Sequence, residues 1–165
     1  MSVAPELHGP TVVLRETVPQ DAPELRRIRR QREVEQWWDP LEDDFPMGDE
    51  PDVDRLTVWR DEAIVGMVQV GQEPEPKYRS ASIDLFLDAA HHGQGIGTEV
   101  VRLVLAHVVQ TLGHHRVTIE AAVDNHRAIA CYEKAGFRRI GVAHRSERDS
   151  DGRGWHDELL MEFVT

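Results

Sequence analysis

The sequence is poor in cysteine and lacks long apolar runs. Its 165 residues include one cysteine, Cys131, so no disulfide can form within the chain, and a reducing, cytoplasmic location is expected. No apolar run approaches the roughly 20 residues that span a bilayer, and the N-terminus shows no basic start followed by an apolar stretch. We therefore expect neither a transmembrane segment nor a signal peptide. The length is that of one average domain, which predicts a single domain over residues 1–165.

Positive charge is also scarce. The chain has 19 lysine and arginine residues against 30 aspartate and glutamate residues, which gives a net charge of −11 at pH 7. A charge of this sign argues against binding to nucleic acid or to an anionic membrane surface. It is compatible with a cationic small molecule or a cationic protein as partner. The hydrophobic share of 40% is ordinary for a globular domain of this length, which can bury a core without disulfides or metals.

Hydrophobic periodicity predicts a mixed α/β chain in the order β-α-β-β-β-α-β-α-β-β. Asp21 and Glu24 form a capping-box pattern at the start of the first helix, and Gly113 and Gly136 are expected to end the other two helices. The strands are expected over residues 11–17, 55–60, 63–70, 81–88, 115–123, 137–145 and 157–164, and the last two helices over 97–112 and 125–135.

An acidic stretch over residues 39–54 follows the tryptophan pair Trp37 and Trp38. It holds eight acidic residues and no basic one, and its prolines and glycine favour a loop. One interpretation is a solvated acidic loop with both tryptophans packed on the body of the protein. The other is one wall of a cation site, in which an aromatic face lies beside carboxylates.

A glycine-rich segment, HHGQGIGTEV (residues 91–100), follows a predicted strand and opens a predicted helix. Its G-x-G-x-G spacing differs from the G-x-G-x-x-G of a dinucleotide site, and it lacks the lysine of a Walker A loop. Glycines let main-chain N–H groups approach a ligand, and a helix N-terminus adds about half a positive charge. The pattern predicts a phosphate or pyrophosphate site, and a tight strand–helix turn is the alternative.

A second motif, DNHRAIACYEKAGF (residues 124–137), lies about thirty residues after the glycine loop. With SIDLFLD, HHGQGIG and VTIEAAV, in this order and spacing, it resembles the GCN5-related N-acetyltransferase (GNAT) superfamily over roughly residues 58–164. The resemblance implies an α/β fold of the α+β kind, with a mixed, mostly antiparallel central sheet flanked by helices. One departure is His92, because the superfamily's loop usually has glutamine or arginine at this place.

Within the superfamily, the sequence is most similar to aminoglycoside 6′-N-acetyltransferases, and siderophore-biosynthesis acyltransferases also resemble it. The features that carry the similarity are the tryptophan pair, the glycine–apolar–glutamine pattern of residues 66–69, the Ile83-Asp84 pair and residues 125–137. The resemblance implies direct transfer of an acetyl group from acetyl-CoA to a primary amine of a cationic small molecule, with the 6′-amine of an aminoglycoside favoured. The alternatives are a polyamine, a peptide N-terminus, a siderophore precursor, or a domain that senses acetyl-CoA without turnover.

The resemblance also implies how acetyl-CoA is held. Main-chain N–H groups of the glycine loop meet the pyrophosphate, and the strand before the loop lines the pantetheine arm. A main-chain N–H near Phe86 or Leu87 stabilises the oxyanion, a contact often worth about 3 kcal/mol. The implied cofactor-binding residues are Leu85, Phe86, Leu87, His92, Gly93, Gln94, Gly95, Ile96, Gly97, Thr98 and Asn125.

Three residues are implied to carry the chemistry. Tyr132 matches the superfamily's tyrosine that protonates the departing thiolate. Asp84 matches an acid of the aminoglycoside enzymes, and partial burial on its strand would raise its pKa toward that of a useful base. Glu120 stands where relatives carry an aspartate, and it can hold a substrate ammonium group or act as a base through water. The alternatives are a core tyrosine and two solvated strand acids.

The acceptor is expected to meet Trp37, Trp38, Asp84, Glu120 and Asp151, although Asp151 also fits a plain Asp-Gly turn. Cys131 is expected to pack rather than to react, because a nucleophilic cysteine needs a base at hydrogen-bond distance. The histidine spacing shows no metal-ligand pattern, so no metal is predicted. We expect no nucleic-acid or membrane partner, and both a monomer and a homodimer stay open.

Overall fold

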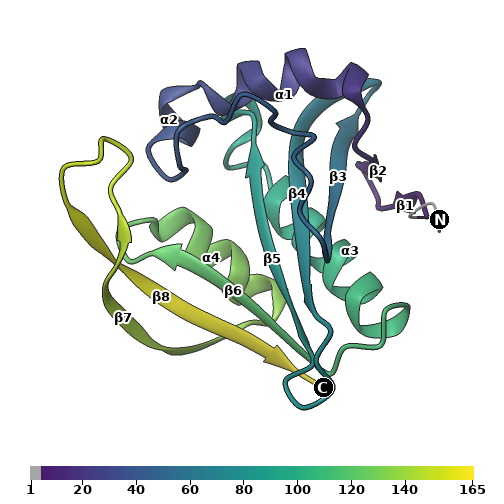
Figure 1. The fold of residues 1–165 in the computed structure, drawn as a ribbon. Coiled ribbons are helices and arrows are strands. Elements are labelled where there is room, and N and C mark those ends of the chain that lie inside the picture. The colour runs from purple at the N-terminus through teal and green to yellow at the C-terminus, as the bar shows by residue number, and fades with distance from the viewer. Residues whose placement is uncertain (1–4) are drawn as a thin grey trace.

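The computed structural model describes residues 5–165, and this part of the chain forms an eight-stranded sheet with the order β1-β2-β3-β4-β5-β6-β8-β7 (Figure 1). The strands are β1 (Leu7–His8), β2 (Val13–Glu16), β3 (Val53–Arg60), β4 (Ala63–Glu73), β5 (Ser80–Leu87), β6 (Arg116–Ala122), β7 (Arg138–Arg148) and β8 (Trp155–Val164). The helices are α1 (Ala22–Arg29), α2 (Arg32–Glu35), α3 (Ile96–Gln110) and α4 (His126–Ala135), with 3₁₀ turns at Pro19–Asp21 and Ala89–His91. Neighbouring strands are antiparallel except for β5 and β6, which confirms the expected mixed, mostly antiparallel sheet flanked by helices.

The sheet opens between its two parallel strands. β5 and β6 pair only at Ala81 with Val117 and at Ser82 with Thr118. Beyond these positions the two strands diverge (Figure 1), while β5 stays paired with β4 along its other edge. Among the described residues, the edge of β5 that faces the opening therefore has no neighbouring strand from Ile83 onward.

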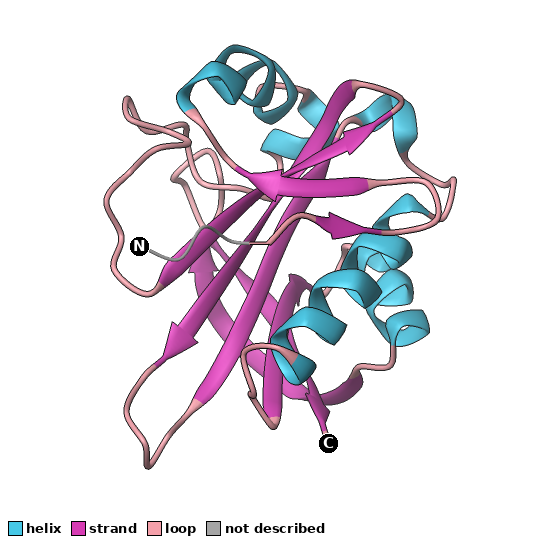
Figure 2. Ribbon diagram, turned by 90° about the vertical axis from the view of Figure 1, so that its right-hand side faces the viewer, coloured by secondary structure: helices cyan, strands magenta, loops and turns pink. Residues whose placement is uncertain are grey.

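The sheet has a separate hydrophobic core on each face. Successive strand residues point to opposite faces, so Ile83 belongs to the larger core, which packs against α3 and α4, and Phe86 belongs to the smaller one. The smaller core brings Leu25 and Ile28 of α1 against Phe86 and Met67. Figure 2 shows the twisted sheet with the helices packed against it. Within residues 5–165, no helix is both long and apolar enough to cross a membrane.

Every strand and helix predicted from the sequence is present, with shifted ends. β4 runs three residues further than predicted, to Glu73, and β7 runs to Arg148. The sequence did not reveal β1 and α2, because two and four residues are too few to show a period. The first helical region is thus two helices, α1 and α2, rather than one.

The expected end of α4 is confirmed, because Gly136 is its C-cap with a φ of +111°, whereas the C-cap of α3 is Thr111, two residues before the expected Gly113. Asn125 caps α4, since its Oδ1 accepts a hydrogen bond from the N–H of Ala128 at 3.3 Å. The expected capping box at Asp21 does not form. The buried Asp21 carboxylate instead accepts from the N–H of Val18 (3.1 Å) and from the Thr57 hydroxyl (2.7 Å), which ties the start of α1 to the sheet.

Candidate active site

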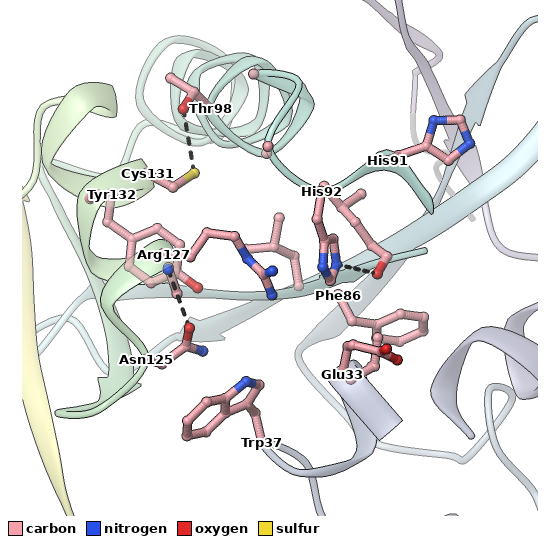
Figure 3. Close-up of a pocket in the computed structure, with 18 of the residues that line it drawn as sticks. Glu33, Trp37, Phe86, His91, His92, Thr98, Asn125, Arg127, Cys131 and Tyr132 are labelled. Atoms are coloured by element: carbon pink, nitrogen blue, oxygen red, sulfur yellow. Dashed lines mark hydrogen bonds between the residues drawn. The ribbon is translucent and has the colours of Figure 1, made fainter. Parts of the chain in front are cut away.

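Two adjoining cavities lie beside the opening in the sheet. The first, of about 270 Å³, lies between the end of β5 and the first turns of α3 and α4 (Figure 3). The second, of about 320 Å³, lies between the diverging parts of β5 and β6 and reaches the β7–β8 hairpin. Five residues line both cavities: Trp37, Trp38, Leu85, Asn125 and Tyr132. The two cavities therefore meet at these side chains.

The glycine loop forms one wall of the first cavity. Gly93 and Gly95 have φ values of +75° and +79°, a left-handed conformation that glycine adopts without strain. Gly95 is the N-cap of α3, and the first N–H groups of a helix have no partner in a preceding turn. Together with the helix dipole, these N–H donors can bind an anion at the N-terminus of α3.

Two residues of the glycine loop turn their side chains away from the first cavity. The Gln94 side chain accepts from Arg60 (2.9 Å) and donates to the carbonyl of Ala90 (3.2 Å). Ile96 is 2% exposed and belongs to the larger core. Like the glycines of the loop, these two residues therefore have only main-chain groups to offer to a ligand in the first cavity.

His92, the departure from the superfamily pattern, ties the loop to the end of β5. Its Nε2 lies 2.8 Å from the carbonyl oxygen of Leu87. Burial lowers the pKa of His92, so the ring is neutral at neutral pH. A neutral ring can contact a carbonyl only as a donor, so Nε2 carries the proton.

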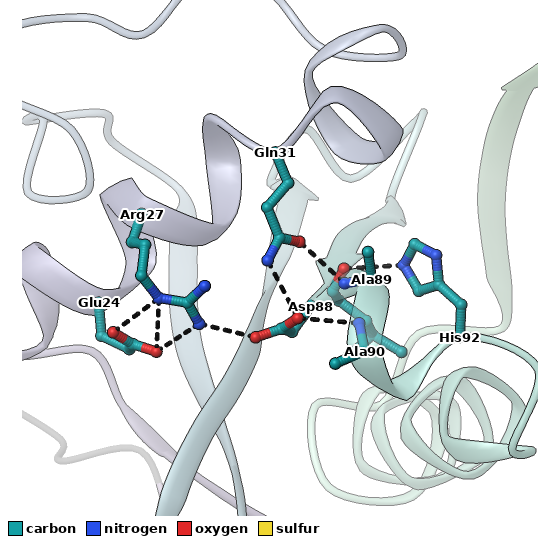
Figure 4. A network of polar contacts seen from close by, with 8 residues as sticks. Glu24, Arg27, Gln31, Asp88, Ala89, Ala90 and His92 are labelled. Atoms are coloured by element: carbon teal, nitrogen blue, oxygen red, sulfur yellow. Dashed lines mark hydrogen bonds and ion pairs between the residues drawn. The ribbon is translucent and has the colours of Figure 1, made fainter.

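A polar network joins α1 to this same end of β5 (Figure 4). Asp88 accepts hydrogen bonds from Arg27 (2.7 Å), from Gln31 (3.0 Å) and from the N–H of Ala90 (2.9 Å). Gln31 in turn accepts from the N–H of Ala89 at 2.8 Å. These hydrogen bonds outweigh the effect of burial and lower the pKa of Asp88 to about 2. The network holds the segment that leads into the glycine loop.

Two basic side chains on α4 also line the first cavity, and neither was predicted from the sequence. Arg127 and Lys134 are seven residues apart, which places them on one side of the helix. Both side chains are exposed, and they line the first cavity together with the N-terminus of α3. Their helical spacing beside the glycine loop is the signal from which they could have been found.

Cys131 lines the first cavity rather than only packing inside the protein. It is half-buried, and the Thr98 hydroxyl lies 3.5 Å from its Sγ. Burial raises the pKa of the Cys131 thiol, so the unreactive protonated form is favoured at neutral pH. This agrees with the expectation that Cys131 is not a nucleophile.

Tyr132 lies where the two cavities meet. It is 5% exposed, and Figure 3 shows its side chain at the cavity wall beside Asn125 and Arg127. Burial raises the pKa of Tyr132, and the negative charge of Asp84 raises it further. The phenol is therefore protonated at every physiological pH and has a proton to give.

Asp84 lies on β5 at the second cavity, opposite Gln69 of β4. Its Oδ1 accepts a hydrogen bond from the N–H of Leu85 at 3.0 Å. The surrounding protein raises the pKa of Asp84 to about 7, and Glu147 and Glu120 add to the rise. The carboxylate is open to the cavity, so water in the empty cavity offsets part of this rise, and the rise is fullest when ligands displace that water.

Three glutamates complete the acidic lining of the second cavity. Glu120 lies on β6 and is exposed, while Glu147 and Glu158 come from the β7–β8 hairpin. Burial raises the pKa of Glu158 to about 9, and the Glu147 carboxyl beside it adds to the rise. With Asp84, four carboxyl groups line this cavity, and none of its lining residues is basic.

The buried Arg29 packs against Trp38, one of the two tryptophans that line the cavities. The rings of Trp38 and Phe86 meet edge to face, with centroids 5.3 Å apart. The Arg29 guanidinium lies 5.0 Å from the Trp38 ring centroid and donates to the carbonyl of Asp39 at 2.6 Å. Trp38 is thus packed on the body of the protein, while the Trp37 ring reaches toward the first cavity (Figure 3).

The acidic stretch and Asp151 lie outside both cavities. No carboxylate of residues 39–54 lines either one, so only the tryptophans of that proposed cation wall are at the site. The Asp151 carboxylate accepts from the N–H of Arg153 at 2.9 Å within the β7–β8 turn. This contact is that of the plain Asp-Gly turn, and it holds Asp151 away from the residues that line the two cavities.

The opened sheet, the glycine loop at a helix N-terminus and the acidic cavity beside them form one continuous site. The model of the acetyltransferase (GNAT) family matches residues 14–137, and the chain belongs to this family. The resemblance found in the sequence is thereby confirmed.

Individual relatives match over part of their length. A probable N-acetyltransferase, YjcK, of Bacillus subtilis is 36% identical over 104 residues, which cover 63% of this chain and 56% of the relative. An aminoglycoside N(6′)-acetyltransferase type 1 of Klebsiella pneumoniae is 34% identical over 71 residues, 43% of this chain and 35% of the relative. The chain thus spans about half, or less, of the length of these curated relatives.

Solved structures share the fold over nearly the whole chain. The structure of Mycobacterium smegmatis RimJ in complex with CoA-disulfide has a TM-score of 0.82 at 23% identity, covering 98% of this chain and 86% of that one. At this identity the likeness establishes the fold alone.

Proposed function

We propose that the chain transfers an acetyl group from acetyl-CoA to a primary amine of a polycationic small molecule, with the 6′-amine of an aminoglycoside as the favoured acceptor. One observation carries this proposal. The second cavity is lined by four acidic residues, Asp84, Glu120, Glu147 and Glu158, and it meets the first cavity at Tyr132. A polycation fits the acidic second cavity, and a nucleotide phosphate fits the first cavity at the N-terminus of α3.

The residues of the first cavity fit coenzyme A. The N–H groups at the start of α3, with Gly93 and Gly95 before them, suit the pyrophosphate, and Arg127 and Lys134 add two positive charges. The free edge of β5 offers main-chain groups and apolar side chains to an extended pantetheine arm. Acetyl-CoA, when bound there, supplies the activated acetyl group.

The residues at the meeting point provide the proton transfers of a direct attack. Asp84, with a pKa near 7, accepts the proton that the acceptor ammonium must lose before it can attack. Tyr132 donates a proton to the departing sulfur. A main-chain N–H on the free edge of β5, at Phe86 or Leu87, stabilises the charge on the acetyl oxygen. Glu120 holds a charged group of the acceptor.

The test is the release of thiol from acetyl-CoA with a panel of amines. The panel contains kanamycin, tobramycin, a 6′-hydroxyl aminoglycoside, spermidine and a peptide with a free N-terminus. Turnover of the 6′-amino compounds but not of the 6′-hydroxyl compound is the expected result, because only the former offer an amine at that position.

The other outcomes are informative as well. Turnover of spermidine or the peptide alone would retain the acetyl transfer and contradict the aminoglycoside assignment. Binding of acetyl-CoA without turnover of any amine would contradict the proposed acetyl transfer to these acceptors and favour a sensing domain. Measurement of acetyl-CoA binding by calorimetry separates this last outcome from a protein that is simply misfolded.

A further inference from the structure

A cluster of possible metal ligands lies at the hairpin end of the acidic cavity. Glu147, His156 and Glu158 each bring a ligand atom within 4.8 Å of the other two. Glu147 and Glu158 line the cavity, while His156 is half-buried beside them. The proposed acetyl transfer does not use the histidine.

The register of the hairpin builds this cluster. Glu147 of β7 lies directly opposite His156 of β8, and Glu158 follows two residues later, so it shares a face of the strand with His156. An irregularity between Ala143 and Glu147 shifts the pairing by two residues. Without this shift, Glu147 would stand opposite Gly154. The ligands come from two strands, which is why no histidine spacing in the sequence indicates a metal.

The hydrogen bonds around His156 orient it as a metal ligand. Its Nδ1 lies 2.9 Å from Oδ1 of Asp149, so Nδ1–H donates to that carboxylate. Its Nε2 is thereby directed at the other two residues, 3.4 Å from Oε1 of Glu158. A carboxylate that fixes one nitrogen while the other faces the ion is the common arrangement behind metal-binding histidines.

Glu158 adds a second, independent observation. Its side chain is 8% exposed, and its Oε2 has no hydrogen-bond partner. A buried carboxyl oxygen without a hydrogen-bond partner, next to two further ligand atoms, is placed where a cation can meet it.

We propose that Glu147, His156 and Glu158 bind a divalent transition-metal ion of the Zn²⁺ type. One imidazole and two carboxylates suit Zn²⁺ better than Mg²⁺ or Ca²⁺, which prefer oxygen ligands alone. Ligand atoms around a tetrahedral Zn²⁺ lie about 3.4 Å apart, so modest side-chain rotation closes the cluster. The ion binds two of the four carboxyl groups of the acceptor cavity and leaves Asp84 and Glu120 for the acceptor.

The test is equilibrium dialysis of the untagged protein against ZnCl₂, with bound zinc measured by mass spectrometry. We expect one Zn²⁺ per chain, and no comparable binding of Mg²⁺. His156→Gln and Glu147→Gln should each weaken binding at least tenfold. Asp149→Asn, which leaves all three ligands in place, should weaken it about 10- to 100-fold by freeing the imidazole.

The hairpin offers a matched control. His144 also contacts an aspartate, with Nδ1 3.2 Å from Asp157, but within residues 5–165 it belongs to no group of three possible ligands. His144→Gln should leave Zn²⁺ binding unchanged. Absence of stoichiometric Zn²⁺ binding would overturn the proposal. So would Zn²⁺ binding by the His156→Gln and Glu147→Gln variants that is as tight as that of the unsubstituted protein. Melting temperatures of the metal-free variants show whether each is folded.

Discussion

At the scale of single residues, Asp84 is subject to opposing influences. Its surroundings and the carboxyl groups of Glu147 and Glu120 raise its pKa, while the N–H of Leu85 and the buried Arg29 lower it. The result, about 7, lies where a base is half-ionised at neutral pH. A base with this pKa loses its function as the pH falls.

We therefore predict that kcat rises with pH through about 7, where Asp84 gives up its proton in the complex with both substrates. Asp84→Asn should lose most of the turnover and also this limb of the profile, because the amide cannot accept a proton. The measurement is kcat against pH from 6 to 9 for both proteins, with both substrates saturating. Near-normal rates of the variant across this range would exclude Asp84 as the base.

Tyr132 supports a separate prediction, because its raised pKa keeps it protonated. Tyr132→Phe removes the proton donor and keeps the ring that packs near Phe137, whose centroid is 6.5 Å away. We expect kcat to fall by about 100-fold or more, the usual range for loss of a general acid, with little change in acetyl-CoA affinity. Steady-state kinetics and calorimetric binding test the two parts. An unchanged kcat would remove the acid role.

The sequence located some of the residues at the cavities and missed others. Asp84, Glu120 and Tyr132 were found because they lie within motifs that resemble a known superfamily, and the structure brings all three to the second cavity. Their roles stay predictions. Glu147 and Glu158 were missed because they lie on the β7–β8 hairpin. The register of this hairpin depends on a pairing irregularity between Ala143 and Glu147 that no local sequence pattern indicates.

At the scale of elements, Gly66 shows how one strand sets the shape of the next. Gly66 of β4 lies opposite Leu87 of β5. A Cβ added to Gly66 would collide with the carbonyl oxygen of Phe86 and would lie 2.8 Å from Cδ2 of Leu87. The backbone of β5 cannot yield without moving the edge that lines the first cavity. The glycine is thus required for close approach of two strands.

We predict that Gly66→Ala lowers the free energy of unfolding by about 1–3 kcal/mol, the usual cost of overpacking. It should also weaken acetyl-CoA binding, since β5 must shift. Gly141→Ala is the matched control, because a Cβ on Gly141, also in a strand, meets nothing within 4 Å. Urea unfolding of both variants makes the comparison. Equal stability of the two would mean that β4 and β5 adjust freely at this position.

Elements with a clear period were predictable, and their arrangement in the sheet was not. The buried valines of α3 recur at helical spacing, and the alternation of Ile83, Asp84 and Phe86 places them correctly on the two faces of β5. The opening between β5 and β6 depends on only two paired positions, and such a tertiary feature leaves no mark on either strand alone.

At the scale of the whole molecule, the charge is divided within the site as well as unbalanced overall. Arg127 and Lys134 line the cavity proposed for the cofactor, whereas four carboxyl groups line the cavity proposed for the acceptor. The net charge of −11 extends the negative potential beyond the site. A polycationic acceptor is therefore attracted from a distance, while a phosphate-bearing cofactor depends on nearby groups.

This division predicts how salt affects turnover. From about 10 mM to about 150 mM salt the Debye length falls from about 30 Å to about 8 Å, so long-range attraction is screened. We expect kcat/KM for a polycationic acceptor to fall by roughly tenfold or more over this range. A monoamine acceptor should lose much less, because it carries one charge into the same field. Steady-state rates for the two acceptors at several salt concentrations, with acetyl-CoA saturating, measure the difference. Equal salt slopes would show that the net charge of the protein does not guide the acceptor, and that the four carboxyl groups act only at contact distance.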